Sequence, residues 1–596
     1  HPKDPSLKLH KKIRKEDLDQ DILGLYNAYR TPIKFKKEYL QEKFQKKEAL
    51  AISFSDKIED TEDEFSIGSN NWAISGNKSF NGSPILANDP HRSIVAPSLR
   101  YLTHLVAPGW NVIGGGEPEI PGISIGHNGF GAWGLTVFRT DAEDLYVYEL
   151  NPKNSKQYWH KGEWLDFKEI KETISVKGKE NQEIVLQYSI HGPVTFVDEK
   201  RNRAYAVKCG WLEVGGSPYL ASLRMNQSQS WEEFREACSY SHIPGENMVW
   251  ADKDGTIGWQ AVGIAPIRNT HSGLVPVLGN GNYEWDGYLP IKEKPHVVNP
   301  SEGFFASANQ NVTPASYKHW NAIGFSWSDP YRGNRVNSVL SNESKNKFTM
   351  QDMMDLQVDY HSLPSEKLIK MIDQTSLDSA NKKYVEMLLA WNNKLTTTSV
   401  EAAIYVNWER TIIREFHEKY VPKNVKGLLN IQLFKIIERI NKLSTKERDE
   451  FLKNTFITSN KELESKFGTE TSNWLYGQEE YKHIKIKHPL EHIVNDSIYK
   501  LVSFKTFPRG GNAYTPGSSG SNLRQSSGAS FRVVIDTKDW DNSVATNSPG
   551  QSGNPNSDFY RNLYEDWAND RFFELYYSKE KIKSNLHSKE VYYPKK

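Results

Sequence analysis

The chain changes its residue pattern twice after its first 68 residues, and this order limits the folds that it can adopt. Up to about residue 346, short apolar segments alternate with Gly, Pro and Asn turns, as at Trp72–Ser75, Pro84–Ala87 and Ile123–Ile125. Residues 347–505 contain few glycines and show helical periods, and loops rich in Gly, Ser and Asn return in residues 506–596 around an apolar strand at 531–535. Because strands and helices do not alternate regularly, the pattern predicts an α+β fold.

Residues 1–68 form a separate segment that is rich in charged side chains of both signs. Apolar residues near a 3.6-residue period predict helices over residues 17–29 and about 38–50. The acidic run 56–64 has no apolar stripe, which is typical of an exposed linker. The chain begins with His1 and no apolar signal-peptide core follows, so we expect it to be a fragment or a processed product.

Charge and hydropathy exclude several classes of protein. The sequence has 75 Lys and Arg against 74 Asp and Glu, a net charge of +1, so we expect no nucleic-acid partner. No apolar run approaches 18 residues, which predicts no membrane span. Cys209 and Cys238 are too few for a disulfide framework or a Cys-rich zinc site.

The most informative short segment is Gly68-Ser69-Asn70-Asn71-Trp72, where the linker ends and an apolar strand begins. By composition alone it is a turn. At this position, however, the Ser69 hydroxyl can attack the unhindered carbonyl of Gly68, and cleavage leaves Ser69 with a free α-amine. An α-amine has a pKa near 8, so it can accept a proton at working pH. One residue then supplies both the nucleophile and the base.

Several segments in a fixed order resemble the penicillin acylase (penicillin amidase) family of N-terminal nucleophile hydrolases. They are Gly68–Gly76, Pro84–His91, Pro121–Gly129, Ala132–Thr136, Ala306–Gln310, Asp329–Arg335 and Asn547–Gly553. The resemblance covers residues 69 to about 580. It implies a four-layer αββα sandwich of two antiparallel sheets, with residues 69–346 and 506–596 as its core and residues 347–505 as a helical insertion.

The resemblance also implies roles for individual residues. Cleavage between Gly68 and Ser69 exposes Ser69 as the nucleophile. The backbone N–H of Val137 and the side-chain amide of Asn309 stabilise the oxyanion. His91 lies near the nucleophile, and its backbone helps to hold the oxyanion. Arg335 positions the amine of the nucleophile and the side chain of Asn309.

A structural calcium ion is a further implication of the resemblance, and catalysis itself needs no cofactor. Asp141, the carbonyl of Glu143 and Asp144 align with the family's calcium ligands, and oxygen ligands suit calcium. The family's further carboxylate, expected shortly after the Asn309 loop, has no clear counterpart in this sequence.

The resemblance implies a self-processing amidohydrolase that removes an acyl group from a small-molecule amide. Its two products would be a small α chain, of which residues 1–68 are the tail and linker, and a large β chain. The remainder of the α chain would be a partner, and the family implies a periplasmic or secreted protein. Two alternatives remain open: an N-acyl-homoserine lactone acylase with a long-chain acyl pocket, and an inactive binding protein on the same scaffold.

Overall fold

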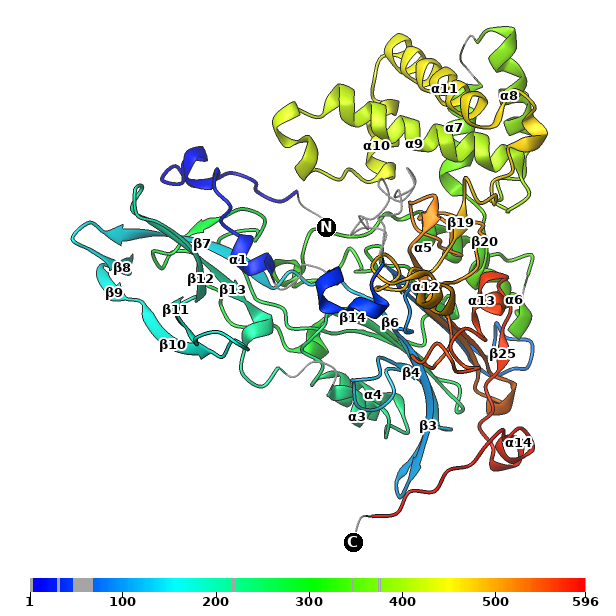
Figure 1. Ribbon diagram of the computed structural model, residues 1–596, viewed down its shortest axis with the longest axis horizontal. Coiled ribbons are helices and arrows are strands. Elements are labelled where there is room, and N and C mark those ends of the chain that lie inside the picture. The colour runs from blue at the N-terminus through cyan, green and yellow to red at the C-terminus, as the bar shows by residue number, and fades with distance from the viewer. Residues whose placement is uncertain are drawn as a thin grey trace.

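Two antiparallel sheets stacked face to face form the centre of the computed structural model, which describes residues 4–28, 33–46, 68–216, 220–345, 347–373, 375 and 377–594 (Figure 1). The first sheet has the order β18 (Phe304–Ser307), β1 (Ser69–Ile74), β2 (Ile85–Ser93), β23 (Phe531–Asp536), β24 (Val544–Asn547) and β25 (Phe573–Glu574), and β22 (Ser527–Ala529) also pairs with β2. The second has the order β17 (His296–Val298), β15 (Ile257–Ala261), β14 (Glu246–Asp252), β6 (Gly131–Val137), β5 (Ile125–His127), β4 (Trp110–Gly116) and β3 (Tyr101–Ala107).

Helices cover the outer faces of both sheets, so the expected four-layer αββα sandwich is confirmed. Strands β1 and β2 stack on β6 and β14 between the sheets. Outside the second sheet, α4 (Trp231–Cys238) packs on β14 and β15 beside α3 (Ala221–Met225). Outside the first, α6 (Met350–Gln357) packs on β2 and β23, and α5 (Tyr331–Leu340) packs on β18.

Strand β1 is buried on both faces because it lies between these layers. Ala73 joins the apolar cluster between the sheets, whereas Trp72 and Ile74 join the cluster beneath α5 and α6. Successive side chains of a strand point to opposite faces, so a continuous apolar run fills both interfaces. This burial fixes the position of Ser69, the first residue of β1.

A third sheet extends from the side of the sandwich, at the left of Figure 1. Its order is β10 (Lys168–Ile174), β11 (Gln182–Ser189), β12 (Gly192–Asp198), β13 (Arg203–Cys209), β7 (Glu143–Asn151), β8 (Asn154–His160) and β9 (Glu163–Asp166), and β16 (Val277–Leu278) pairs with β7. A small sheet joins β20 (Phe507–Pro508), β19 (His483–Ile484) and β21 (Arg524–Gln525). Near it in the chain are the short helices α12 (Asp496–Val502), α13 (Tyr564–Ala568) and α14 (Lys579–Ser584).

A bundle of helices lies at one end of the molecule, between residues 363 and 467 (Figure 1). It contains α7 (Leu363–Ile372), α8 (Ser379–Ala390), α9 (Val400–Tyr420), α10 (Leu433–Asn441) and α11 (Thr445–Phe467), which share an apolar core of their own. Ser399 and Ser444 cap the two longest helices with their side-chain oxygens, which satisfies free N–H groups at the helix starts.

The prediction of two helices near the N-terminus is wrong for the residues that the structure describes. Only short turns occur there: a 3-10 turn at Lys15–Leu18, α1 at Gly24–Asn27, and 3-10 turns at Lys37–Tyr39 and Glu42–Phe44. Isolated helices of about 12 residues are marginal in water unless an apolar face packs against other elements, and most side chains here are exposed. The acidic run 56–64 lies outside the described residues.

Within the described part of the chain, none of the helices combines the length and apolar character that a membrane crossing requires. Cys209 and Cys238 are both buried free thiols.

Candidate active site

Ser69 lies buried at the start of β1, opposite Pro90 of β2. Its backbone N–H donates to the Oδ1 atom of Asn309 at 2.7 Å. The carbonyl oxygen of the preceding residue, Gly68, accepts a hydrogen bond of 2.8 Å from the backbone N–H of His91. The peptide bond between Gly68 and Ser69 is therefore held at both its carbonyl and its N–H.

Asn309 connects Ser69 to Val137. It follows β18, and its Nδ2 atom donates to the carbonyl oxygen of Val137 at 3.1 Å. Its φ angle is +69°, in the left-handed region that Asn tolerates better than most residues. Backbone strain of this kind persists where the surroundings hold it, and often at functional sites. The structure thus brings Ser69, Asn309 and Val137 together.

The arginine beside Asn309 is Arg332, and the expectation of Arg335 in this place is corrected. Arg332 donates to the carbonyl of Ser69 at 3.0 Å, to Asn70 Oδ1 at 2.7 Å and to Asn309 Oδ1 at 3.0 Å. Burial lowers the pKa of Arg332 to about 10, so it stays protonated at neutral pH. Arg335 instead pairs with Asp359 at 2.6 Å.

Both arginines belong to the first turns of α5, so the motif alone did not distinguish them. Their spacing of three residues places them on neighbouring sides of the helix. Gly333 brings α5 close to the Asn309 loop, because a Cβ atom there would lie 2.3 Å from the side chain of Gln310. This approach lets Arg332 reach the start of β1.

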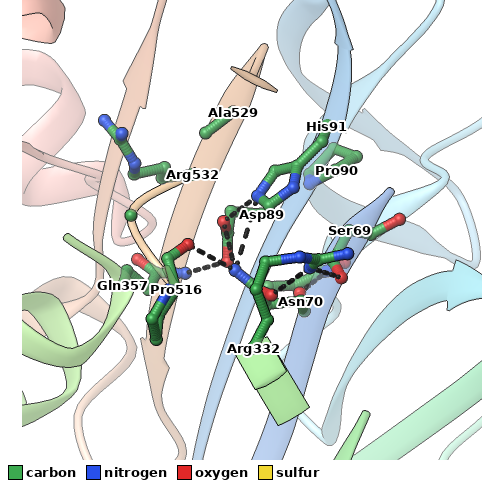
Figure 2. A network of polar contacts seen from close by, with 12 residues as sticks. Ser69, Asn70, Asp89, Pro90, His91, Arg332, Gln357, Pro516, Ala529 and Arg532 are labelled. Atoms are coloured by element: carbon green, nitrogen blue, oxygen red, sulfur yellow. Dashed lines mark hydrogen bonds and ion pairs between the residues drawn. The ribbon is translucent and has the colours of Figure 1, made fainter. Parts of the chain in front are cut away.

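A buried group of polar side chains lies behind Ser69 (Figure 2). The Nε2 atom of His91 lies 2.7 Å from Asp89 Oδ2, and Asn70 Nδ2 donates to the same oxygen at 2.9 Å. Burial, and then the charges of Arg332 and Arg532, hold the pKa of His91 well below its usual value. A neutral imidazole that donates from Nε2 fits this geometry. The ring of His91 thus contacts Asp89 and Asn70, whereas its backbone contacts the Gly68 carbonyl.

Gly68 has no room for a side chain. A Cβ atom at this residue would lie 2.5 Å from Arg332 Nη2 and 2.6 Å from Asn309 Oδ1. A glycine is therefore required at this position, because any side chain would clash with the groups that hold Ser69. Glycine also leaves its own carbonyl open to attack.

The residues expected to bind calcium do not fit a metal ion. Arg268 donates to side-chain and carbonyl oxygens of Asp141, to the carbonyl of Glu143 and to the carboxylate of Asp144. In the described residues, no group of three or more His, Cys, Asp or Glu side chains has an arrangement that would hold a metal. Calcium needs six to eight oxygen ligands around one point, and a guanidinium lies among these oxygens instead.

Sequence reasoning missed Arg332, Asp89, Asn70 and Arg268. The first three lie inside the motifs quoted above. The motifs therefore indicated the region of the site, but they did not indicate what these residues do. Arg268 lies in none of these motifs, and only the fold brings it to Asp141.

Comparison with known proteins gives a consistent result. The family model described as penicillin amidase matches residues 8–584. Acyl-homoserine lactone acylase QuiP of Pseudomonas aeruginosa is 25% identical over 563 residues, which cover 85% of this chain and 66% of that protein. Penicillin G acylase of Escherichia coli is 28% identical over 289 residues, which cover 48% of this chain and 34% of that protein.

In three dimensions, the chain resembles a thermostable penicillin G acylase from Alcaligenes faecalis. The TM-score is 0.70 at 21% sequence identity, and the match covers 88% of this chain and 100% of that chain. This similarity supports the fold. The alignments cover less than two thirds of the two sequence relatives named above.

Proposed function

Because the chain belongs to the penicillin amidase family, we propose that it is a self-processing amidohydrolase that removes an acyl group from an amide, with Ser69 as its N-terminal nucleophile. The single observation that carries the proposal is the environment of the Gly68–Ser69 bond. Its carbonyl oxygen accepts from the N–H of His91, and its N–H donates to Asn309.

Self-cleavage would begin with attack of the Ser69 hydroxyl on the carbonyl carbon of Gly68. Negative charge then develops on the carbonyl oxygen, which the N–H of His91 already faces. The C–N bond breaks, the nitrogen gains a proton, and an ester joins Gly68 to the Ser69 oxygen. Water hydrolyses this ester, which releases the Gly68 carboxylate and leaves Ser69 with a free α-amine.

The freed Ser69 would act on the substrate by the same chemistry. Its α-amine accepts the hydroxyl proton, directly or through a water molecule, as the oxygen attacks the substrate carbonyl. The proton passes to the leaving amine, and an acyl ester forms on Ser69. Water then hydrolyses the ester. The backbone N–H of Val137 and the amide of Asn309 are proposed to stabilise the oxyanion, and Arg332 positions Asn309.

The proposal includes two chains that stay associated, one ending at Gly68 and one beginning at Ser69. Residues 1–68 would be the end of the smaller chain, whose remainder would complete the substrate pocket. A periplasmic or secreted location is proposed on the same family basis.

A second candidate substrate class is the N-acyl-homoserine lactones. The acyl-homoserine lactone acylase QuiP of Pseudomonas aeruginosa aligns over 85% of this chain, whereas the penicillin G acylase of Escherichia coli aligns over 48%. Both classes share a linear amide bond, and they differ in the acyl group. An aromatic acyl amide and acyl-homoserine lactones of increasing chain length would separate them.

Intact mass and N-terminal sequencing of the purified protein test the proposal. We expect two chains, the larger beginning at Ser69, and hydrolysis of at least one acyl amide. The Ser69→Ala variant should remain a single inactive chain, and Ser69→Cys should mature at least in part. Two chains in purified Ser69→Ala would rule out self-cleavage by this residue.

A further inference from the structure

The loop that joins β6 to β7 carries Asp141, and a buried arginine from a distant segment holds it. Arg268 donates from Nη1 to the carbonyl oxygen of Asp141 at 2.9 Å and from Nη2 to its Oδ1 at 3.3 Å. It also donates to the carbonyl of Glu143 at 3.4 Å and from Nε to Asp144 Oδ2 at 2.9 Å. One guanidinium thus engages the two carboxylates and the Glu143 carbonyl that the family resemblance assigns to calcium.

We propose that the guanidinium of Arg268 takes the place of a structural calcium ion in this protein, so that the folded protein neither binds nor needs calcium at Asp141 and Asp144. A guanidinium is planar, always charged and suited to paired carboxylates, so one side chain can satisfy several oxygens in a buried position.

The second reason is that other donors occupy the same carboxylate. His271 Nε2 lies 3.0 Å from Asp144 Oδ2, and the indole N–H of Trp285 donates to the same oxygen. The guanidinium carbon of Arg268 also lies 5.5 Å from the centre of the Trp285 ring, within the range of a cation–π contact. Three donors around Oδ2 leave that oxygen unsuited to binding a cation, whereas Oδ1 of Asp144 has no hydrogen-bond partner in the described residues.

The third reason is that the chain is packed closely around the guanidinium. Arg268 is 6% exposed. Gly273 has a φ angle of +81°, and a Cβ atom there would lie 2.9 Å both from the guanidinium carbon of Arg268 and from Asp141 Oδ2. A glycine is therefore needed where the backbone turns past this ion pair.

A second buried basic side chain holds the preceding part of the loop. Lys294 is fully buried, and its Nζ atom donates to Thr140 Oγ1 at 2.7 Å and to the carbonyl oxygens of Val262 and Gly263 at 2.8 and 3.0 Å. Val137, at the end of β6, lies directly before this loop. The side chains of Arg268 and Lys294 thus fix the segment that follows Val137.

The experiment measures calcium content and thermal stability, and neither readout depends on activity or on the proposed function. The protein is passed through gel filtration in a calcium-containing buffer, and metal content is measured by mass spectrometry. We expect far less than one calcium ion per chain and equal melting temperatures in calcium and in EDTA. One bound calcium ion per chain, or a melting temperature that falls by several degrees in EDTA, would overturn the proposal.

The variant Arg268→Ser tests the role of the guanidinium, with Arg235→Ser as a matched control. Arg235 is also a partly buried arginine, but it donates to Gln260 and to the carbonyl of Lys292, away from the loop. We expect Arg268→Ser to melt several degrees below Arg235→Ser in EDTA, because the buried carboxylate of Asp144 and the partly buried carboxylate of Asp141 lose their cation. Equal melting temperatures of the two variants would contradict the proposal. The calcium measurement on the unmodified protein stands even where Arg268→Ser fails to fold.

Discussion

The backbone N–H of His91 donates a 2.8 Å hydrogen bond to the carbonyl oxygen of Gly68. This contact belongs to the pairing of β1 with β2, so the sheet itself presents the donor to the carbonyl before any cleavage occurs. A donor already in place costs no reorganisation when negative charge develops on that oxygen. The side chain of His91 is turned instead toward Asp89, so the two parts of this residue have separate partners.

The space around Gly68 predicts slow maturation of Gly68→Ala. Its Cβ atom would approach Arg332 and Asn309 within 2.6 Å, which displaces the groups that hold Ser69. The time course of two-chain formation, followed by intact mass, measures the effect. Gly216→Ala is the control, because a Cβ atom there meets nothing closer than 3.5 Å. Equal rates for the two variants would show that Gly68 is not sterically required.

Arg332 and Arg335 predict opposite outcomes for two otherwise similar substitutions. Arg332→Lys removes a buried fork that holds Asn309 and the Ser69 carbonyl, and the loss of about 2 kcal/mol corresponds to a roughly 30-fold lower kcat. Arg335→Lys alters a partly exposed pair with Asp359 and should leave kcat within about twofold, since such pairs contribute little. Steady-state kinetics of the processed enzymes measure both. A larger loss in Arg335→Lys would favour the assignment from the sequence.

Asn309→Asp keeps the size and backbone preference of this residue but removes its amide donor. Asp also tolerates the left-handed backbone that Asn309 adopts, so we expect the variant to fold. It lacks the Nδ2 donor proposed for the oxyanion, and loss of one such donor lowers kcat by about 10²–10³-fold. Circular dichroism confirms folding, and kcat is measured on processed protein. A folded variant with unchanged kcat would remove Asn309 from the proposed oxyanion site.

Glu246 predicts a dependence of stability on pH. It lies opposite Val137 in the β14–β6 pair, and neither of its carboxylate oxygens has a hydrogen-bond partner in the described part of the chain. Burial raises its pKa from 4.5 to about 7. Between these values the native state keeps a proton that the unfolded chain has released, so the free energy of unfolding falls as pH rises, by at most about 3 kcal/mol.

Glu246→Gln should therefore unfold at a higher urea concentration than the wild type near pH 8, and the difference should shrink toward pH 4.5. Glu163→Gln, on the exposed strand β9, is the control and should show no such trend. A difference between Glu246→Gln and wild type that does not change with pH would contradict the role of this buried proton.

The residue pattern predicted the α+β class and individual strands because these signals are local, whereas the four layers were implied by the family resemblance. The apolar segment Trp72–Ser75 and the strand at 531–535 fall in or beside β1 and β23, and the helical periods within residues 347–505 include α9. The prediction of helices near the N-terminus was wrong because it rested on a local signal alone. In the first of them, Ile22 and Leu18 pack against the third sheet, but Leu23 and Leu25 are exposed, so no continuous apolar face supports a long helix.

Ordered motifs and strand periods lie in neighbouring residues, so the residues alone were enough to predict the family, the α+β fold class and a strand just after Ser69. Tertiary structure decided that Arg332 rather than Arg335 holds Asn309, since the choice depends on how α5 docks on the sheet. It also decided that Arg268 lies among Asp141, Glu143 and Asp144. Arg268 lies more than a hundred positions from these three residues in the chain, and only folding brings its guanidinium within hydrogen-bonding distance of them.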